Sequence, residues 1–144
     1  MIKYLVLISV SVGWVTANAQ IREVLFNSFP ADSMTSIKFN MQDSTVIHEW
    51  HNSAIFIETE VSMSGCPESL LKHAVGQGRY IVEALREGQT ITLKHVHNRP
   101  QINYPRGTCT EVVVHRIYLP GDFKKVDPTE WKRSDELSKS TLNY

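Results

Sequence analysis

The feature that most constrains the fold is AIFIETEVSM, residues 54–63, the longest run of strict alternation in the chain. One face of this run carries mainly apolar side chains, namely Ile55, Ile57, Thr59, Val61 and Met63. The other face carries Glu58, Glu60 and Ser62. Because successive side chains of a strand point to opposite sides, this pattern predicts a β-strand with one buried face.

Five further segments show strand patterns: residues 36–41, 45–50, 79–86, 89–97 and 111–120. In the second of these, Val46, His48 and Trp50 share a face, which we predict to be the apolar one. Short turns separate several of the segments, so neighbouring strands are expected to pair antiparallel. The chain is therefore predicted to be mainly β, either an antiparallel sheet sandwich or a short β-solenoid-like domain.

The spacing of apolar residues changes from that of a strand to that of a helix at residues 66–78, CPESLLKHAVGQG. Pro67 suits the first position of a helix, apolar residues recur four apart, and Gly76 is a stop signal. This predicts one inserted helix over about 67–76, acting as a crossover or as a lid over an open sheet edge. Near the end of the chain, Asp127 and Pro128 are typical of a helix start. We predict a helix over about 128–139 within a polar tail, residues 124–144.

The N-terminus has the layout of a secretory signal peptide. Lys3 precedes an uncharged apolar run, and the small residues Ala17 and Ala19 follow in an A-x-A pattern. The run is shorter than the roughly 20 residues that a membrane-spanning helix needs. We therefore expect cleavage after residue 19, a single β-rich domain over 20–123, and a secreted or periplasmic protein of bacterial type.

Charge and hydropathy argue against two classes of partner. The chain has 15 Lys and Arg residues against 15 Asp and Glu residues, so it lacks the basic field that nucleic-acid binding requires. After the signal peptide there is no apolar stretch long enough to span a membrane.

Two cysteines, Cys66 and Cys109, follow the signal peptide. Exported compartments are oxidising, so a disulfide between them is expected. The alternative is a reactive Cys66 thiol at the helix N-terminus, paired with His73 or His115. No C-x-x-C motif and no third orienting residue support that alternative.

Histidines recur on strand faces that carry apolar residues. His95 and His97 are two residues apart, on the same face as Ile91 and Leu93, and His115 is in phase with valine and isoleucine. Our first interpretation is that these imidazoles are hydrogen-bonded at sheet ends. The alternative is a zinc or copper site formed by His95, His97 and His115 in a small periplasmic metal-binding protein.

Signatures of common enzymes are absent: the chain contains no G-x-S-x-G, no glycine-rich phosphate loop and no H-E-x-x-H. Glu58 and Glu60 could suggest a glycosidase pair, but two carboxylates on a solvated strand face are ordinary. The loop over 98–110 contains Arg99, Tyr104 and Arg106, which could bind an anionic or sugar ligand. Our first interpretation is a solvated loop held in place by Cys109. We expect no catalytic residues and no cofactor.

Several phrases resemble a known class of protein: FPADSMTSIKFN, VIHEW, AIFIETEV, GQGRY and GTCTEVVVHRIYLPGDF. Together these span about Phe29 to Phe123 and are similar to the opening segment of adhesin-type, β-solenoid-like proteins of the bacterial envelope. The resemblance implies a non-enzymatic binding or structural module at the cell envelope. Its partner would be an envelope protein or a glycan.

Overall fold

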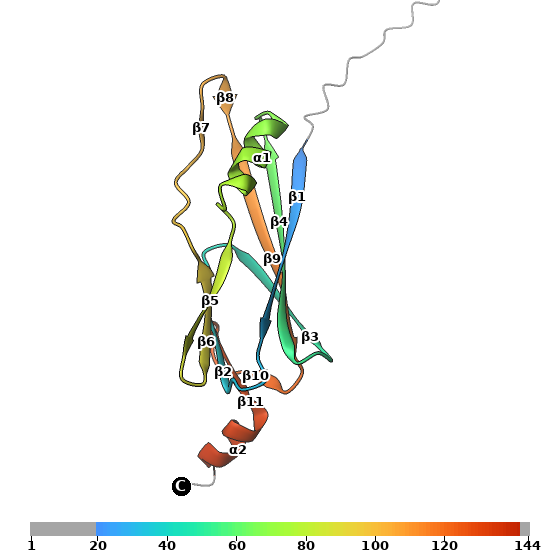
Figure 1. Ribbon diagram of the computed structural model, residues 1–144, viewed down its shortest axis with the longest axis vertical. Coiled ribbons are helices and arrows are strands. Elements are labelled where there is room, and N and C mark those ends of the chain that lie inside the picture. The colour runs from blue at the N-terminus through green and yellow to red at the C-terminus, as the bar shows by residue number, and fades with distance from the viewer. Residues whose placement is uncertain (1–19, 142–144) are drawn as a thin grey trace, which may run out of the picture.

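The computed structural model describes residues 20–141, so the predicted signal peptide lies outside the described residues. Two β-sheets pack face to face (Figure 1). The four-stranded sheet has the order β1–β4–β9–β3, formed by β1 (Ile21–Pro30), β4 (Ala54–Ser64), β9 (Thr110–Pro120) and β3 (Ser44–Trp50). The mainly β prediction is confirmed, and the shared core favours a sandwich over a solenoid.

The second sheet has five strands in the order β10–β11–β2–β6–β5. They are β10 (Phe123–Lys125), β11 (Glu130–Arg133), β2 (Ser36–Asn40), β6 (Thr90–His95) and β5 (Val82–Glu87). A small hairpin of β7 (Asn103–Tyr104) and β8 (Gly107–Thr108) lies in the loop before β9. Within the described residues, no helix is long and apolar enough to cross a membrane.

Strand pairing differs from the antiparallel expectation at two places. β3 pairs with β9 in parallel, and β2 pairs with β6 in parallel. β2, β3 and β4 follow one another in the chain but are not hydrogen-bonded neighbours, because β2 joins the other sheet and β9 lies between β3 and β4. Among the strand segments predicted from the sequence, those that became β5 and β6 pair as their short turn predicts, turning at Gly88 with a φ of 60°.

Helix α1 (Glu68–Gly76) confirms the predicted inserted helix, with Pro67 as its N-cap. α1 lies against the upper halves of β4, β9 and β1, beyond the reach of the five-stranded sheet (Figure 1). Its buried Leu71 and Ala74 pack there with residues of β4 and β9. The helix therefore covers the half of the four-stranded sheet that has no facing sheet.

The core consists of two hydrophobic clusters that share β4 and β9. The lower cluster lies between the sheets and includes Ile57 and Ile117, while the upper cluster under α1 includes Val61 and Val113. A polar pair interrupts this face: Thr59 of β4 and His115 of β9 are register partners, and both are fully buried.

Near the sheet margins, the predicted buried face of β3 is wrong, and the predicted C-terminal helix is present but starts later than expected. In β3 it is Ile47 that packs against the core, whereas Val46 and His48 are exposed. At the C-terminus the predicted helix over 128–139 begins only with α2 (Ser134–Thr141), since the residues before it form β11. Asp127 accepts a hydrogen bond from the Thr129 amide at 2.7 Å, so it shapes a turn between β10 and β11 instead of capping a helix.

Candidate functional sites

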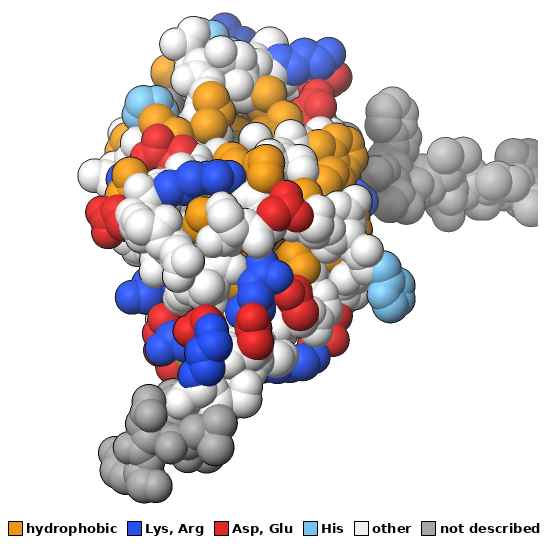
Figure 2. All heavy atoms as spheres, turned by 60° about the horizontal axis from the view of Figure 1, so that its bottom comes forward, with side chains coloured by type: hydrophobic (Ala, Val, Ile, Leu, Met, Phe, Trp, Pro, Cys, Tyr) orange, Lys and Arg blue, Asp and Glu red, His pale blue; other side chains and the backbone are white. Residues whose placement is uncertain are grey.

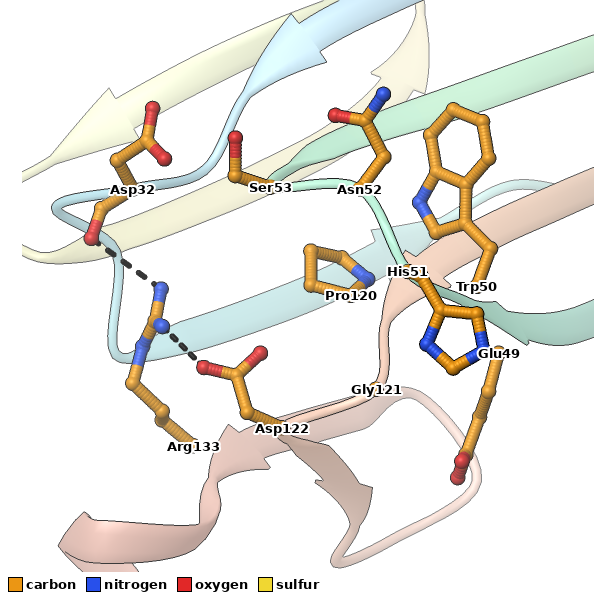
Figure 3. Close-up of a pocket in the computed structure, with 10 residues that line it drawn as sticks. All are labelled: Asp32, Glu49, Trp50, His51, Asn52, Ser53, Pro120, Gly121, Asp122 and Arg133. Atoms are coloured by element: carbon orange, nitrogen blue, oxygen red, sulfur yellow. Dashed lines mark hydrogen bonds and ion pairs between the residues drawn. The ribbon is translucent and has the colours of Figure 1, made fainter.

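A hollow of ≈ 580 Å³ lies at the end of the sandwich where three connections meet (Figure 3). The β1–β2 connection contributes Asp32, and the β9–β10 connection contributes Asp122. The β3–β4 connection and the end of β3 contribute Glu49, Trp50, His51, Asn52 and Ser53. Binding sites commonly form on such loop clusters because the sheets beneath hold them in place.

Arg133, the last residue of β11, ties two of these connections together. Its guanidinium donates to the Ala31 carbonyl at 2.8 Å, to the Asp32 carbonyl at 3.3 Å, and to the carboxylate of Asp122. The same group lies 4.6 Å from the ring centroid of Phe123, a cation–π contact. The loops around the hollow are therefore held in one arrangement before any ligand arrives.

Several polar groups around the hollow are unused within the described part of the chain. The carboxylate of Asp32, the imidazole of His51 and the hydroxyl of Ser53 make no hydrogen bond or ion pair with another described side chain or backbone group. Asn52 accepts from the Ala54 amide through Oδ1 at 3.2 Å, which leaves its NH₂ free to donate. Hydroxyl-rich ligands need such mixed donors and acceptors at short range.

The rim of this hollow continues onto the outer face of the four-stranded sheet through Trp50. Five rings form a row there, which we call the aromatic strip: Phe26, Phe56, Tyr118, His48 and Trp50. Neighbouring ring centroids are 5.1–5.9 Å apart. Phe26 is 61% exposed, which is unusual for so large an apolar side chain. The strip crosses all four strands of the sheet.

Register explains why these rings meet. Tyr118 of β9 is the cross-strand partner of Phe56 on β4 and of His48 on β3. Directly opposed side chains lie about 4.5–5.5 Å apart at Cβ, so rings in these positions come into contact. The inner face of the same strands is filled by isoleucine and leucine, which leaves the rings on the solvent side.

Charged side chains beside the aromatic strip are paired. Arg116 donates to Glu58 at 2.6 Å and to Glu60 at 2.9 Å, and Arg22 also reaches Glu60 at 2.6 Å. Glu58 and Glu60, the carboxylates first considered as a glycosidase pair, thus share a guanidinium on a solvated face. On the face shown in Figure 2, acidic and basic side chains also lie side by side and form no patch of a single sign.

A second cluster lies at the junction of the two hydrophobic clusters. Asp43 from the β2–β3 connection, His95 at the end of β6 and His115 in β9 offer ligand atoms that all lie within 4.8 Å of one another. His115 Nε2 is 3.2 Å from Asp43 Oδ2, and its Nδ1 is 2.9 Å from Thr59 Oγ1. We call Asp43, His95 and His115 the seam cluster.

His95 is the unsatisfied member of the seam cluster. Its side chain is 9% exposed, and its Nε2 lies 2.8 Å from Asp43 Oδ2. Nε2 therefore meets the carboxylate, whereas Nδ1 has no hydrogen-bond partner among the described residues. Buried polar atoms without partners are uncommon in folded proteins and call for an explanation.

Two arginines connect the seam cluster to a second carboxylate. Arg99 donates to Asp43 Oδ2 and lies 3.5 Å from Glu111 Oε1. Arg79 donates to Glu111 Oε2 at 2.8 Å. Arg99 also lies 5.7 Å from the ring centroid of Tyr80. Arg99, which we considered as a surface ligand-binding residue, is therefore largely buried in an ionic network.

The Asp43 carboxylate is held in its charged form. Its partial burial would by itself raise the pKa, but His115, His95 and Arg99 all face it and together lower the pKa well below the usual range. The carboxylate is therefore available as an anionic ligand at any ordinary pH.

The histidines predicted as a metal set are only partly brought together. His95 and His115 meet, but β6 ends at His95, and the exposed His97 does not join the cluster. Asp43 takes the third position, and sequence reasoning missed it because a turn residue reveals nothing about which distant strands surround it. His48 is exposed on the aromatic strip and is not a member of the seam cluster.

The predicted disulfide is present: Cys66 and Cys109 are bonded, with Cα atoms 5.2 Å apart. It joins the start of α1 to the start of β9, which removes the alternative of a reactive Cys66 thiol. Comparison of the chain with protein-family models, with curated proteins and with solved structures found no match. The resemblance to envelope adhesins therefore stays a prediction from the residues.

Proposed function

We propose that this protein is a non-enzymatic binding module of the cell envelope, exported by its N-terminal signal, whose ligand is a neutral glycan. The observation that carries the proposal is the continuity between the loop-end hollow and the aromatic strip through Trp50. One sugar unit would occupy the hollow, and the following units would lie over the rings of the strip. The adhesin-type resemblance supports the same class of role.

The chemistry of the hollow favours a polyhydroxyl ligand without negative charge. The carboxylates of Asp122 and Glu49 are paired with Arg133 and Lys124, whereas that of Asp32 has no cationic partner in the described residues 20–141. The uncompensated charge repels anions, so phosphorylated or acidic ligands are disfavoured. Asp32, Asn52 and Ser53 instead offer the acceptors and donors that sugar hydroxyls require.

The aromatic strip suits the apolar faces of sugar rings. Flat aromatic surface contributes contact area at small entropic cost, because each ring has only two rotatable bonds. Trp50 already donates its indole N–H to the Ala54 carbonyl at 2.8 Å, so its ring is fixed in orientation. A ligand that stacks on it does not have to order it.

Three residues resemble a catalytic triad, and their burial supports binding without catalysis. Thr59, His115 and Asp43 are connected like a nucleophile, base and orienting acid. Both Thr59 and His115 are completely buried, so a substrate has no route to the hydroxyl. Their burial argues against a catalytic role for these three residues.

Glycan binding can be tested on the purified protein with cellohexaose, maltoheptaose and chitohexaose as neutral probes and oligogalacturonate as an acidic one. Titration calorimetry and tryptophan fluorescence should detect binding of at least one neutral probe and no binding of the acidic probe. An aromatic stacking contact is worth roughly 0.5–1.5 kcal/mol, so Trp50→Ala should weaken binding up to about ten-fold.

Leu85→Ala is the matched control, because Leu85 is also an exposed large apolar residue but lies on the other sheet. The affinity of Leu85→Ala for the neutral probe should equal that of the unmodified protein. Failure of every neutral probe to bind, or equal binding by Trp50→Ala, would refute the proposal. A protein complex abolished by Trp50→Ala without any glycan binding would instead assign the aromatic strip to a protein partner.

A further inference from the structure

The seam cluster has no part in the proposed glycan site, yet it gathers three strong ligand types at one point. We propose that Asp43, His95 and His115 bind a single Zn²⁺ ion. Each residue offers one ligand atom, and the three atoms lie within 4.8 Å of one another. Two histidines and one carboxylate form a known zinc ligand set, with bonds of about 2.0–2.2 Å.

The unsatisfied state of His95 is the second, independent observation. The side chain is more than nine-tenths buried, and its Nδ1 lacks a hydrogen-bond partner within the described residues. Its Nε2 lies 2.8 Å from Asp43 Oδ2, the same carboxylate oxygen that Nε2 of His115 faces. A purely structural histidine in this position would be expected to hydrogen-bond. A metal ion between these atoms would satisfy the Nε2 lone pair.

Thr59 acts as the supporting group for the proposed site. Its hydroxyl lies 2.9 Å from Nδ1 of His115, which fixes the orientation of the ring. Histidines that bind metals nearly always use their second nitrogen in this way. Because Thr59 and His115 are register partners on adjacent strands, this support is built into the sheet.

Access to the proposed site runs past His95. A hollow of ≈ 230 Å³ is lined by residues on either side of the cluster, among them Gln42, His95 and Arg99. Asp43 itself is 15% exposed. An ion can therefore reach the ligands from solvent, and a water molecule has room to complete the coordination.

Arg99 would compete with a metal ion for the Asp43 carboxylate. Its guanidinium contacts the Asp43 oxygen that faces both imidazoles, so it is a competing cation. When zinc binds, Arg99 would move off this oxygen and remain held by Glu111, 3.5 Å away, and by the ring of Tyr80. Removing the guanidinium should therefore strengthen zinc binding, which a site unrelated to metal would not show.

The test uses the full chain purified without an affinity tag or chelator, with ZnCl₂ as titrant and MgCl₂ as the control salt. Calorimetry should give one zinc per chain, and Co²⁺ substitution should give visible absorption bands of a low-symmetry nitrogen and oxygen site. His95→Ala should weaken zinc binding at least ten-fold, and Thr59→Val, which removes the supporting hydroxyl, about 10–100-fold. Arg99→Met should strengthen it.

His97→Ala is the matched control, since His97 is exposed two residues from His95 and outside the seam cluster. Circular dichroism establishes that each variant is folded before titration. The proposal is overturned if the unmodified chain binds no zinc, if His95→Ala binds as tightly as the unmodified chain, or if His97→Ala removes binding. Glycan binding by Trp50 is measured separately, so either proposal can fail without the other.

Discussion

Breaking the bond between Cys66 and Cys109 should lower the free energy of unfolding by about 4 kcal/mol. The two cysteines are 43 residues apart in the chain, and the loop they close contains α1, β5 and β6. Opening a loop of this size restores conformational freedom to the unfolded chain, which is the main source of the loss. Domains of this kind have total stabilities of roughly 5–15 kcal/mol, so the loss is a large fraction.

The measurement is urea unfolding followed by tryptophan fluorescence, with and without a phosphine reductant. The unfolding midpoint should fall and the slope should rise, because the unfolded chain without its cross-link exposes more surface. In a thermal scan, the same loss corresponds to a fall of about 15 °C. The double variant Cys66→Ala/Cys109→Ala should behave like the reduced protein and be insensitive to the reductant.

Cys109 is buried beside Met63, so the double variant also loses some packing that the reduced protein keeps. The difference in unfolding free energy between the reduced protein and the double variant therefore gives the contribution of the sulfur contacts, apart from that of the cross-link. A loss below about 1 kcal/mol in the reduced protein would refute the loop-closure reasoning. Free thiols in the oxidised protein, detected by mass spectrometry, would refute the bond itself.

Two further predictions concern single positions. Gly65 has a φ of 78°, and a Cβ there would lie 2.2 Å from the Thr108 carbonyl oxygen, so Gly65→Ala should cost more than the roughly 1–2 kcal/mol of the left-handed conformation alone. Gly88→Ala is its control, because Gly88 also has a positive φ but open space around it; equal losses in urea unfolding would contradict the clash. The buried Tyr80 hydroxyl has no hydrogen-bond partner among the described residues, so Tyr80→Phe should stabilise the protein by about 1 kcal/mol at pH 7. Burial, and then the charge of Glu111, raise the pKa of Tyr80 above its usual value. Since the unfolded chain then releases this proton first, stability should fall as the pH rises above ~10, a fall that the phenylalanine variant should lack. A destabilised Tyr80→Phe variant would show that the hydroxyl is bonded.

Local patterns predicted the elements whose two faces differ strongly. The alternation over 54–63 anticipated β4 and the inward direction of Thr59, and the i, i+4 spacing anticipated α1. β1 was missed, because Val24, Leu25 and Phe26 are consecutive apolar residues that obscure the alternation. In β3 the apolar Val46 and Trp50 suggested the wrong buried face, since their side of the strand carries the exposed rings.

The features that were not predicted depend on tertiary contacts, which local sequence patterns do not show. β11 was taken as helix because Asp127 and Pro128 suit a helix start as well as a turn, and nothing local shows that Trp131 packs into a core. The seam cluster shows the same limit. Its histidines were singled out from strand phase, but Asp43 joins them only because β2 and β3 belong to different sheets, so the connection between them passes the end of β6.

The position of β9 has a consequence for how the chain folds during synthesis. β9 is the strand that links β4 to β3, yet it is made long after both. β2 similarly needs β6 and β11 as neighbours. The four-stranded sheet cannot be completed until the chain has been made to residue 120, and the five-stranded sheet until residue 133. Pairings between such distant segments form slowly. The polypeptide should therefore stay open and accessible to chaperones through most of its synthesis, which is the state that the proposed export would require.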